Sequence, residues 1–434
     1  MRSSLRAALL LLTLGGIGCV DDIGTPYLLE TDPPTLRVVT PAGNATVTGD
    51  VLLASASTTD LGSGADIFVS SEGVEEQRLI SFEPDTLRHA LLALDAVFAA
   101  TSAPGLDFVA VDGASNQTRA SRTLRRSSSA AAVRLETGLR DTQTLARAPD
   151  GSVWFLTESG LGVYRAGTFE AHPLDGTEPD GLAIGSDGTV WLVEAATRRL
   201  FRYEDGRARL AVTLPLRPEP RFAVAPDGAL WFASRSRVLR WDGNGEVETL
   251  ELPSSGSFEI RGIAFAPSGV VWVATSLDIF QYDGAWQRIA PERFGLGVVA
   301  GNVLISDPDR LLVDGITTDG AGVPWVMAVG YLRRLDGPWV SLDPLALGGL
   351  SLDDSCDNLI ILDNYPVRFA PASNDGLWFT ARDFVIRRDA AGTMSGFSGL
   401  FEGLDSCIFA ADIALAGDGR LLVLREASLV ALDV

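Results

Sequence analysis

The stretch of sequence that decides the fold is AVAPDGALWFASRSRVLRWDGNG, residues 223–245. It contains a Pro-Asp-Gly turn, an apolar run with a tryptophan, and a segment that alternates apolar and polar residues before an Asp-Gly turn. Glycine supplies the positive φ of a tight hairpin, and alternation with a period of two is typical of β-strands. The stretch therefore predicts short antiparallel strands joined by tight turns.

This unit recurs along the C-terminal part of the chain. Its tryptophan reappears at intervals of 37 to 53 residues, at Trp154, Trp191, Trp231, Trp272, Trp325 and Trp378, with Leu422 in the seventh copy. Four short strands per unit of about 40 residues is the period of a β-propeller. We therefore expect an all-β chain whose residues 131–434 form seven blades. Because residues 291–315 and 343–367 are insertions between copies, counts of six or eight blades remain open.

The two ends of the repeat region complement each other. The seventh copy stops after three strands, and residues 131–139, AAVRLETGL, form a predicted strand that precedes the first copy. We expect this strand to pair with the last blade as its outer strand. Such pairing closes the ring and removes the exposed edges of an open sheet.

Residues 35–123 show strand composition with turn signals about every ten residues, as in a β-sandwich. The phrases TPAGNATVTGDVLLASASTTD and FVAVDGASNQTRAS resemble bacterial immunoglobulin-like modules. The resemblance implies an immunoglobulin-like β-sandwich, and residues 124–130, LRRSSSA, are predicted to be a linker to the propeller.

The N-terminus carries an export pattern. Residues 1–18 combine two arginines with a short apolar run, and GIGC before Val20 resembles a bacterial lipobox. The resemblance implies lipid attachment at Cys19, with residues 19–34 as a tether; the alternative is an ordinary cleaved signal. Cys356 and Cys407 are then an even pair, for which a disulfide is expected in an oxidising compartment.

The net charge of the chain limits the classes of partner that we expect. The formal net charge is −21, which repels phosphate backbones, so a nucleic-acid partner is not expected. The predicted location is the bacterial cell envelope, periplasmic or surface-exposed, with the membrane reached through the lipid anchor.

The tandem repeat resembles the propeller repeats of two-component sensor proteins and those of the streptogramin (virginiamycin B) lyase family, whose units also read like PDGxxWF. The lyase resemblance implies a histidine base, a glutamate and a divalent metal. Glutamates follow the tryptophan strand at Glu158 and Glu194, but His172, the one histidine of the propeller, lies elsewhere in its repeat. We therefore expect no catalytic residue, no metal and no cofactor.

The candidate site is the face formed by the turns between second and third strands and by the connections between blades. The turns carry candidate binding residues for a protein or polar ligand, namely Glu158, Glu194, Arg198, Arg235, Arg237, Arg382, Arg425 and Glu426. Asp278 and Asp383 lie in the same turns, and the connections add Arg140, Asp180, Arg221, Glu259 and Arg261.

The repeated tryptophans are expected to fill the space between adjacent blades, because large aromatic side chains dominate cores. Three others, Trp241, Trp286 and Trp339, are expected on outer strands or their turns, partly exposed.

The favoured function is binding or scaffolding at the cell envelope through this charged face. The alternatives are a propeller enzyme, either a streptogramin-lyase-like lyase or a hydrolase, and an extracytoplasmic ligand-sensor subunit.

Overall fold

The computed structural model divides the chain into two compact units. The N-terminal unit ends at Arg125 and leaves out Val47–Leu52, which group with the C-terminal unit. The structure describes residues 33–58, 65–72, 74–79, 87–127, 132–136, 144–157, 160–174, 176–219, 222–253, 259–276, 278–289, 313–328, 331–335, 339–341, 368–372, 376–381, 384–397, 412–425 and 428–434.

The N-terminal unit is built from two groups of strands. One is a five-stranded sheet in the order β2 (Ala45–Val47), β8 (Gln117–Arg126), β7 (Gly105–Val111), β4 (Asp66–Ser71) and β5 (Val74–Arg78). In the other, β3 (Val51–Ser57) pairs with β1 (Arg37–Thr40) and β6 (Leu87–Ala93), and β6 leads into the short helix α2 (Leu94–Val97). Side chains of β7 alternate between solvent and core, with Leu106 and Phe108 fully buried.

Strand β8 extends past the boundary predicted after residue 123. Strand β8 continues to Arg126, and Leu124 is fully buried, so the start of the predicted linker 124–130 belongs to a sheet.

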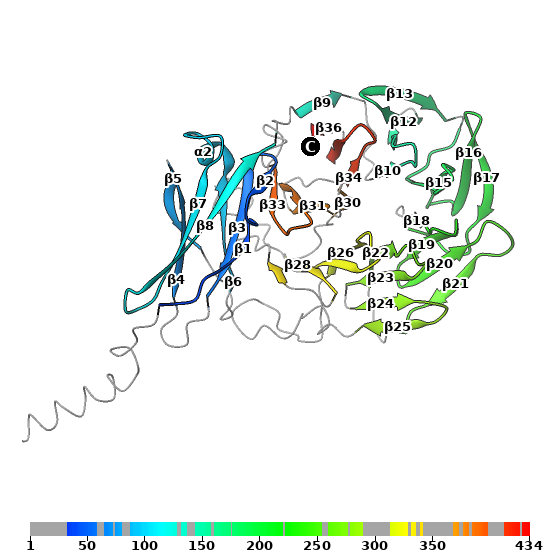
Figure 1. The fold of residues 1–434 in the computed structure, drawn as a ribbon. Helices are drawn as coiled ribbons and strands as arrows, with labels where there is room; N and C mark the ends of the chain where they lie inside the picture. Colours follow the sequence, from blue (N-terminus) through cyan, green and yellow to red (C-terminus); the bar gives the residue numbers. More distant parts are fainter. Residues whose placement is uncertain are drawn as a thin grey trace, which may run out of the picture. The chain divides into compact units, whose positions relative to one another are not determined.

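Within its described residues the C-terminal unit contains seven successive sets of four antiparallel strands, here called blades 1 to 7. Six of them are separate four-stranded sheets, and the four strands of blade 6 are part of a seven-stranded sheet. In Figure 1 they follow one another around a circle. Blades 1 to 3 are β10 (Leu145–Arg147), β11 (Val153–Thr157), β12 (Gly160–Arg165) and β13 (Thr168–Pro173); β14 (Gly181–Ile184), β15 (Val190–Glu194), β16 (Arg199–Glu204) and β17 (Arg207–Thr213); and β18 (Phe222–Val224), β19 (Leu230–Ser234), β20 (Arg237–Trp241) and β21 (Glu248–Glu251).

The later blades repeat this order. Blades 4 to 6 are β22 (Ile260–Phe265), β23 (Val271–Thr275), β24 (Ile279–Tyr282) and β25 (Trp286–Ile289); β26 (Val313–Thr318), β27 (Pro324–Ala328), β28 (Tyr331–Arg334) and β29 (Trp339–Ser341); and β30 (Phe369–Pro371), β31 (Leu377–Ala381), β32 (Phe384–Arg388) and β33 (Met394–Phe397). Blade 7 is β34 (Asp412–Leu415), β35 (Arg420–Arg425), β36 (Ser428–Asp433) and β9 (Ala132–Glu136).

Strand β9 supplies the fourth strand of blade 7. It pairs antiparallel with β36, from Ser428 opposite Glu136 to Leu432 opposite Ala132. This is the pairing expected for the strand that precedes the first repeat.

Blades 7 and 1 also meet through side chains. The Tyr164 hydroxyl of blade 1 donates to Asp418 Oδ2 of blade 7 at 3.0 Å and accepts from Arg420 Nη1 at 3.1 Å. The turns of the two blades touch at Gly417 and Gly151, where the N–H of Gly417 donates to the Gly151 carbonyl at 2.7 Å. The first and last blades are therefore in direct contact.

The repeated tryptophans lie between blades, as predicted. Trp154 of blade 1 meets Tyr203 of blade 2, and Trp231 of blade 3 meets Tyr282 of blade 4, with ring centroids 6.1 and 5.5 Å apart. The prediction for Trp241 is wrong: its side chain is only 6% exposed, because it ends the third strand of blade 3 and faces Trp191 of blade 2. Trp286 is half-buried on an outer strand, and the side chain of Trp339 is outside the described part.

Residues 47–52 lie against the outer strand of blade 6. The N–H of Thr48 donates to Ser395 Oγ at 2.9 Å, and that of Asp50 donates to the Gly396 carbonyl at 2.8 Å. A side chain at Gly49 would put its Cβ 1.8 Å from the Gly396 oxygen, so glycine is required for this approach.

Among the described residues, no helix is long and apolar enough to cross a bilayer.

Candidate functional site

Each blade has two ends, which its strand directions define. The turns between first and second strands and between third and fourth strands lie at one end, called the turn end. The turns between second and third strands and the connections to the next blade lie at the other, called the loop end. The candidate residues named from the sequence belong to the loop end.

Glu194 ends the second strand of blade 2 and links two segments of the loop end by hydrogen bonds. One carboxylate oxygen accepts from the Glu178 N–H at 3.0 Å, and the other accepts from the Thr197 hydroxyl at 2.7 Å. Its side chain is only 12% exposed, with Arg199 Nε 3.7 Å away. The carboxylate is thus occupied in holding the connection from blade 1 against the hairpin of blade 2.

Other blades place a hydroxyl at or next to the end of the second strand, where it binds the incoming connection. Ser234 of blade 3 donates to the Arg217 carbonyl at 2.7 Å, and Thr380 of blade 6 accepts from the Arg368 N–H at 2.9 Å. Because the uncharged side chains of serine and threonine make corresponding contacts in other blades, we infer that the contacts of Glu194 are structural. The sequence signal for Glu194 as a binding residue was its position alone.

Asp180 lies beside this arrangement. Its carboxylate accepts from the Ala195 N–H at 3.0 Å, on the hairpin of blade 2. Burial raises its pKa above the usual 3.8, and the charge of Glu194 acts in the same direction, whereas hydrogen bonds from backbone N–H groups and the charge of Arg217 oppose the rise. Asp180 is therefore a carboxylate that gives up its proton less readily than an exposed aspartate.

The arginines of blades 2 and 3 differ from these carboxylates. Arg198 and Arg235 stand in turns with φ of +60° and +52°, the left-handed region that side chains with a Cβ seldom occupy. Arg198 Nη1 donates to the Pro215 carbonyl at 3.1 Å, and the Arg235 carbonyl accepts from the Ile260 N–H at 3.2 Å. Both side chains are exposed.

Arg217 joins them at the loop end, from the connection between blades 2 and 3. Sequence reasoning placed the charge of this connection at Arg221, which is outside the described residues, and missed Arg217. Within the described part of the chain, no carboxylate lies within 4.0 Å of the guanidinium nitrogens of Arg198, Arg217 or Arg235. We call these three residues the arginine set.

The remaining described candidates are paired. Arg237 Nε lies 2.8 Å from Glu251 on the neighbouring outer strand, and Arg261 lies 3.2 Å from Glu259. Asp278 of blade 4 has a side chain only 8% exposed and lies 2.5 Å from Arg288. These pairs belong to their own blades and do not converge on one point.

Several predicted site residues lie partly or wholly outside the described part of the structure. Of Arg425 only the backbone, in β35, is described. Outside the described residues lie Glu158, Arg382, Glu426, Arg140, Asp383, the proposed lipid site Cys19, and the proposed disulfide pair Cys356 and Cys407.

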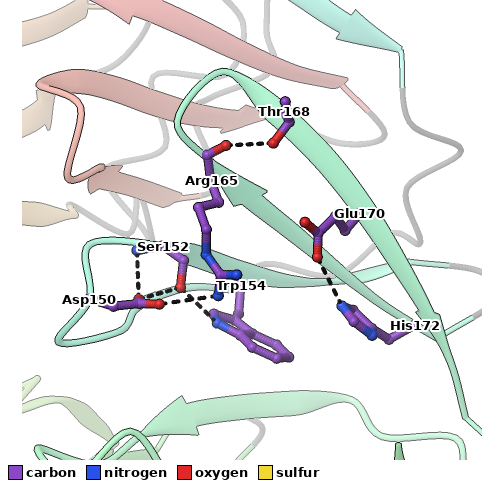
Figure 2. Close-up of polar contacts among 7 residues, drawn as sticks. All are labelled: Asp150, Ser152, Trp154, Arg165, Thr168, Glu170 and His172. Carbon is purple, nitrogen blue, oxygen red and sulfur yellow. Dashed lines mark hydrogen bonds and ion pairs between the residues drawn. The ribbon is translucent and has the colours of Figure 1, made fainter.

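His172, the residue relevant to a lyase, lies on the outermost strand of blade 1 (Figure 2). Its ring stacks on Trp154 with centroids 5.7 Å apart and an angle of 17°, and its Nε2 is 3.7 Å from Glu170 Oε2. The innermost strand of this blade is β10, so His172 is three strands away from it. Its surroundings are those of a half-exposed histidine packed on an indole.

The turn end of the same blade shows how the indole is oriented. Asp150 accepts from the Ser152 hydroxyl at 2.6 Å and from Arg165 Nη2 at 3.1 Å, and Ser152 Oγ accepts from Trp154 Nε1 at 3.1 Å (Figure 2). The hydrogen bonds from Ser152 lower the pKa of Asp150, with Arg165 adding to the effect. The Asp-Gly signature of the repeat thus serves the turn and, in blade 1, the tryptophan.

Among the described residues, no group of three or more His, Cys, Asp or Glu side chains is arranged to hold a metal ion.

Comparison with known proteins establishes the fold. Virginiamycin B lyase from Staphylococcus aureus matches with a TM-score of 0.51 and 17% identity, over 70% of this chain and 99% of that protein. A streptogramin B lyase structure matches with a TM-score of 0.52 and 15% identity, over 70% and 97%. The C-terminal unit has the β-propeller fold.

The extracellular domain of the one-component system protein BT4673 from B. thetaiotaomicron is also similar, with a TM-score of 0.50 and 11% identity over 70% of this chain and 39% of that one. No family model matches the chain, and no curated protein matches it. At these identities the likeness concerns the propeller fold alone.

Proposed function

We propose that this chain is an exported, lipid-anchored protein of the cell envelope that binds a partner protein through the loop end of blades 2 and 3. The lipid is attached at Cys19, and residues 35–126 form an immunoglobulin-like sandwich that spaces the propeller from the membrane. The propeller has seven blades, and β9 closes its ring. The antiparallel pairing of β9 with β36 and the contact between Tyr164 and Asp418 support this closure.

The observation that carries the binding function is the backbone conformation of Arg198 and Arg235. At the turn end, the positive φ positions of the blade hairpins are mostly glycines, such as Gly151, Gly188 and Gly228. A residue with a Cβ in this region costs about 1–2 kcal/mol. Arginine in place of glycine at two neighbouring turns therefore points to a use for its guanidinium group, since such strain gathers at functional sites.

The charge of the arginine set indicates the chemistry of the partner. The neighbouring carboxylates of Glu194 and Asp180 are engaged by N–H and hydroxyl groups, whereas the three guanidinium groups face solvent. Arginine recognises carboxylates through paired hydrogen bonds, and it is enriched at the centres of protein interfaces. The favoured partner therefore presents acidic side chains to the loop end, against the overall −21 charge of the chain.

The experiment compares a loop-end variant with a charge-matched control. Arg198→Glu/Arg235→Glu reverses two members of the arginine set, and Arg207→Glu/Arg209→Glu makes the same charge change on exposed residues of β17, the outer strand of blade 2. Cross-linking in intact cells should give the same partner for the wild type and the control. We expect the yield to fall at least tenfold for the loop-end variant.

Two outcomes would refute this function. One is equal loss of the cross-linked partner in both variants, which would show that net charge alone matters. The other is full retention by the loop-end variant, which would leave the loop end of blades 2 and 3 without a role in binding.

A further inference from the structure

One position near the end of the third strand is equivalent in all seven blades, because it lies opposite the residue that precedes the repeated tryptophan, or Leu422 in blade 7. In six blades this position holds an aromatic or aliphatic side chain, namely Tyr164, Tyr203, Trp241, Tyr282, Leu335 and Leu432. Where ring contacts between neighbouring blades occur, the side chain at this position packs against the tryptophan of the preceding blade. Trp241, for example, packs against Trp191 with ring centroids 5.7 Å apart. The position is therefore part of the packing between blades.

Blade 6 is the exception, because it has Arg388 there. The guanidinium carbon lies 4.8 Å from the ring centroid of Trp325 in blade 5, so the arginine replaces an aromatic ring as the neighbour of this indole. A charged group in an otherwise apolar position breaks the local rule of the repeat. Departures of this kind are expected at functional sites.

The hydrogen-bonding capacity of Arg388 is largely unused. Nη1 donates to the Asp389 carbonyl at 3.1 Å, while Nε is buried with no hydrogen-bond partner in the described part of the chain. Burial lowers the pKa of Arg388, the charge of Asp389 opposes this, and the charge of Arg334 adds to it. An unpaired buried donor on a charged group is costly, so arginine at this position carries a cost that an apolar residue would not.

The carboxylates nearby are already engaged. Asp319 accepts from Arg334 Nε at 2.8 Å and from Trp325 Nε1 at 3.3 Å. Asp389 accepts from the Thr393 N–H through Oδ1 at 2.8 Å. Two guanidinium groups, those of Arg334 and Arg388, therefore gather around one indole, and only Arg334 has an ion-pair partner among the described residues.

The site is open on one side. Arg388 remains partly exposed, and Gly392 in the following turn has no side chain; a Cβ there would come within 3.4 Å of Arg388 Nη2. An anion can thus approach Nη2 across this glycine, at the turn end of the propeller.

We propose that Arg388, stacked on Trp325 and adjacent to Arg334, is a carboxylate-binding site at the turn end between blades 5 and 6. A planar carboxylate fits the guanidinium fork through two parallel hydrogen bonds. The carboxylate belongs either to a small organic acid or to an acidic side chain of a protein. This site lies at the opposite end of the blades from the arginine set and is independent of it.

The test is a titration of the full chain with succinate at constant ionic strength, followed by calorimetry and by thermal unfolding. We expect saturable binding in the millimolar range and a saturable rise in Tm. Arg388→Leu, which installs the residue found at Leu335 and Leu432, should weaken binding at least tenfold. Arg202→Leu is the matched control, since Arg202 also lies over a tryptophan, Trp191, at 6.0 Å, but has Glu204 as an ion-pair partner.

A second variant guards against misfolding. Arg388→Lys keeps the charge but not the fork, so it should bind succinate several-fold more weakly while unfolding at nearly the wild-type temperature. A hexapeptide with two glutamates, compared with its glutamine analogue, distinguishes a protein side chain from a free acid: tighter binding of the acidic peptide than of succinate identifies the protein source.

Two results would overturn the site. The first is a linear, unsaturable effect of succinate that is equal in wild type, Arg388→Leu and Arg202→Leu. The second is saturable binding that Arg388→Leu and Arg388→Lys leave unchanged.

Discussion

Trp191 of blade 2 meets Trp241 of blade 3 edge to face, with ring centroids 5.7 Å apart and planes at 88°. Aromatic pairs favour this arrangement, and each large ring removes much apolar surface from water. Trp241→Ala should therefore lower the free energy of unfolding by about 3–5 kcal/mol. Urea unfolding followed by circular dichroism measures the loss, and Trp286→Ala, on a half-buried outer-strand residue, should lose less. An equal or greater loss for Trp286→Ala would contradict this ranking.

The hydroxyl of Tyr164 joins blade 1 to blade 7 through Asp418 and Arg420. Tyr164→Phe leaves the ring buried but removes this hydroxyl, so it should cost about 1–2 kcal/mol. Tyr203→Phe is the control, because no hydrogen bond of the Tyr203 hydroxyl occurs within the described residues. If the two variants unfold at the same urea concentration, the contact between the first and last blades adds nothing measurable.

Gly417 permits the turns of blades 7 and 1 to touch. A Cβ at this position would lie 2.9 Å from the Cα of Gly151, so Gly417→Ala must push two backbones apart. The expected loss is about 1–3 kcal/mol, as for an overpacked core. Gly105→Ala is the control, since a Cβ there meets nothing within 4 Å. If Gly105→Ala unfolds at a lower temperature than Gly417→Ala, the steric argument is refuted.

Asp180 should give a distinctive dependence of stability on pH. Because its pKa is raised in the folded state, the native protein holds this proton more tightly than the unfolded chain. Its contribution to stability is therefore fully present below pH 3.8, the ordinary value, and is lost as pH rises through the raised pKa. Asp180→Asn keeps an acceptor for the Ala195 N–H and should remove this loss.

The measurement is the free energy of unfolding of both proteins from pH 3 to pH 7. The difference between Asp180→Asn and wild type should move in favour of the variant as pH rises. A constant difference across this range would show that the surroundings of Asp180 do not perturb its proton affinity.

The proposed lipid anchor gives a prediction in the cell. The wild-type chain should sediment with membranes and require detergent for release, because lipid chains bury in the bilayer. Cys19→Ser should appear in the soluble fraction, whereas Cys356→Ser should remain with the membranes. Membrane association of Cys19→Ser would favour some other attachment.

The sequence was sufficient for the parts of the fold that repeat. The Asp-Gly turns and the spacing of the tryptophans predict the blades, and the unpartnered strand before the first copy predicts the pairing with β36. The burial of Trp241 was missed because it depends on the side of the strand that faces the neighbouring blade. That side is set by the register with Leu230, which a pattern along one chain does not show.

The candidate site was less predictable, for two physical reasons. Position alone placed Glu194 and Arg198 at the loop end. Only the structure shows that Glu194 is engaged by Glu178 and Thr197, and that Arg198 is paired with no carboxylate of the described residues. The positive φ of Arg198 and Arg235 could not be predicted from the sequence, because arginine is not a residue type that indicates this conformation. Arg388, by contrast, could have been noticed by comparing the ends of the third strands across all seven copies.

The partnership of β9 and β36 has a consequence for biosynthesis. Strand β9 emerges from the ribosome about 290 residues before the segment that receives it. Bringing such distant segments together is slow, because the entropy of a long loop must be lost before the contacts form. Blade 7 contains β9, the first propeller strand to be translated, and is thus completed last. The nascent chain carries β9 without its partner until β36 has been synthesised.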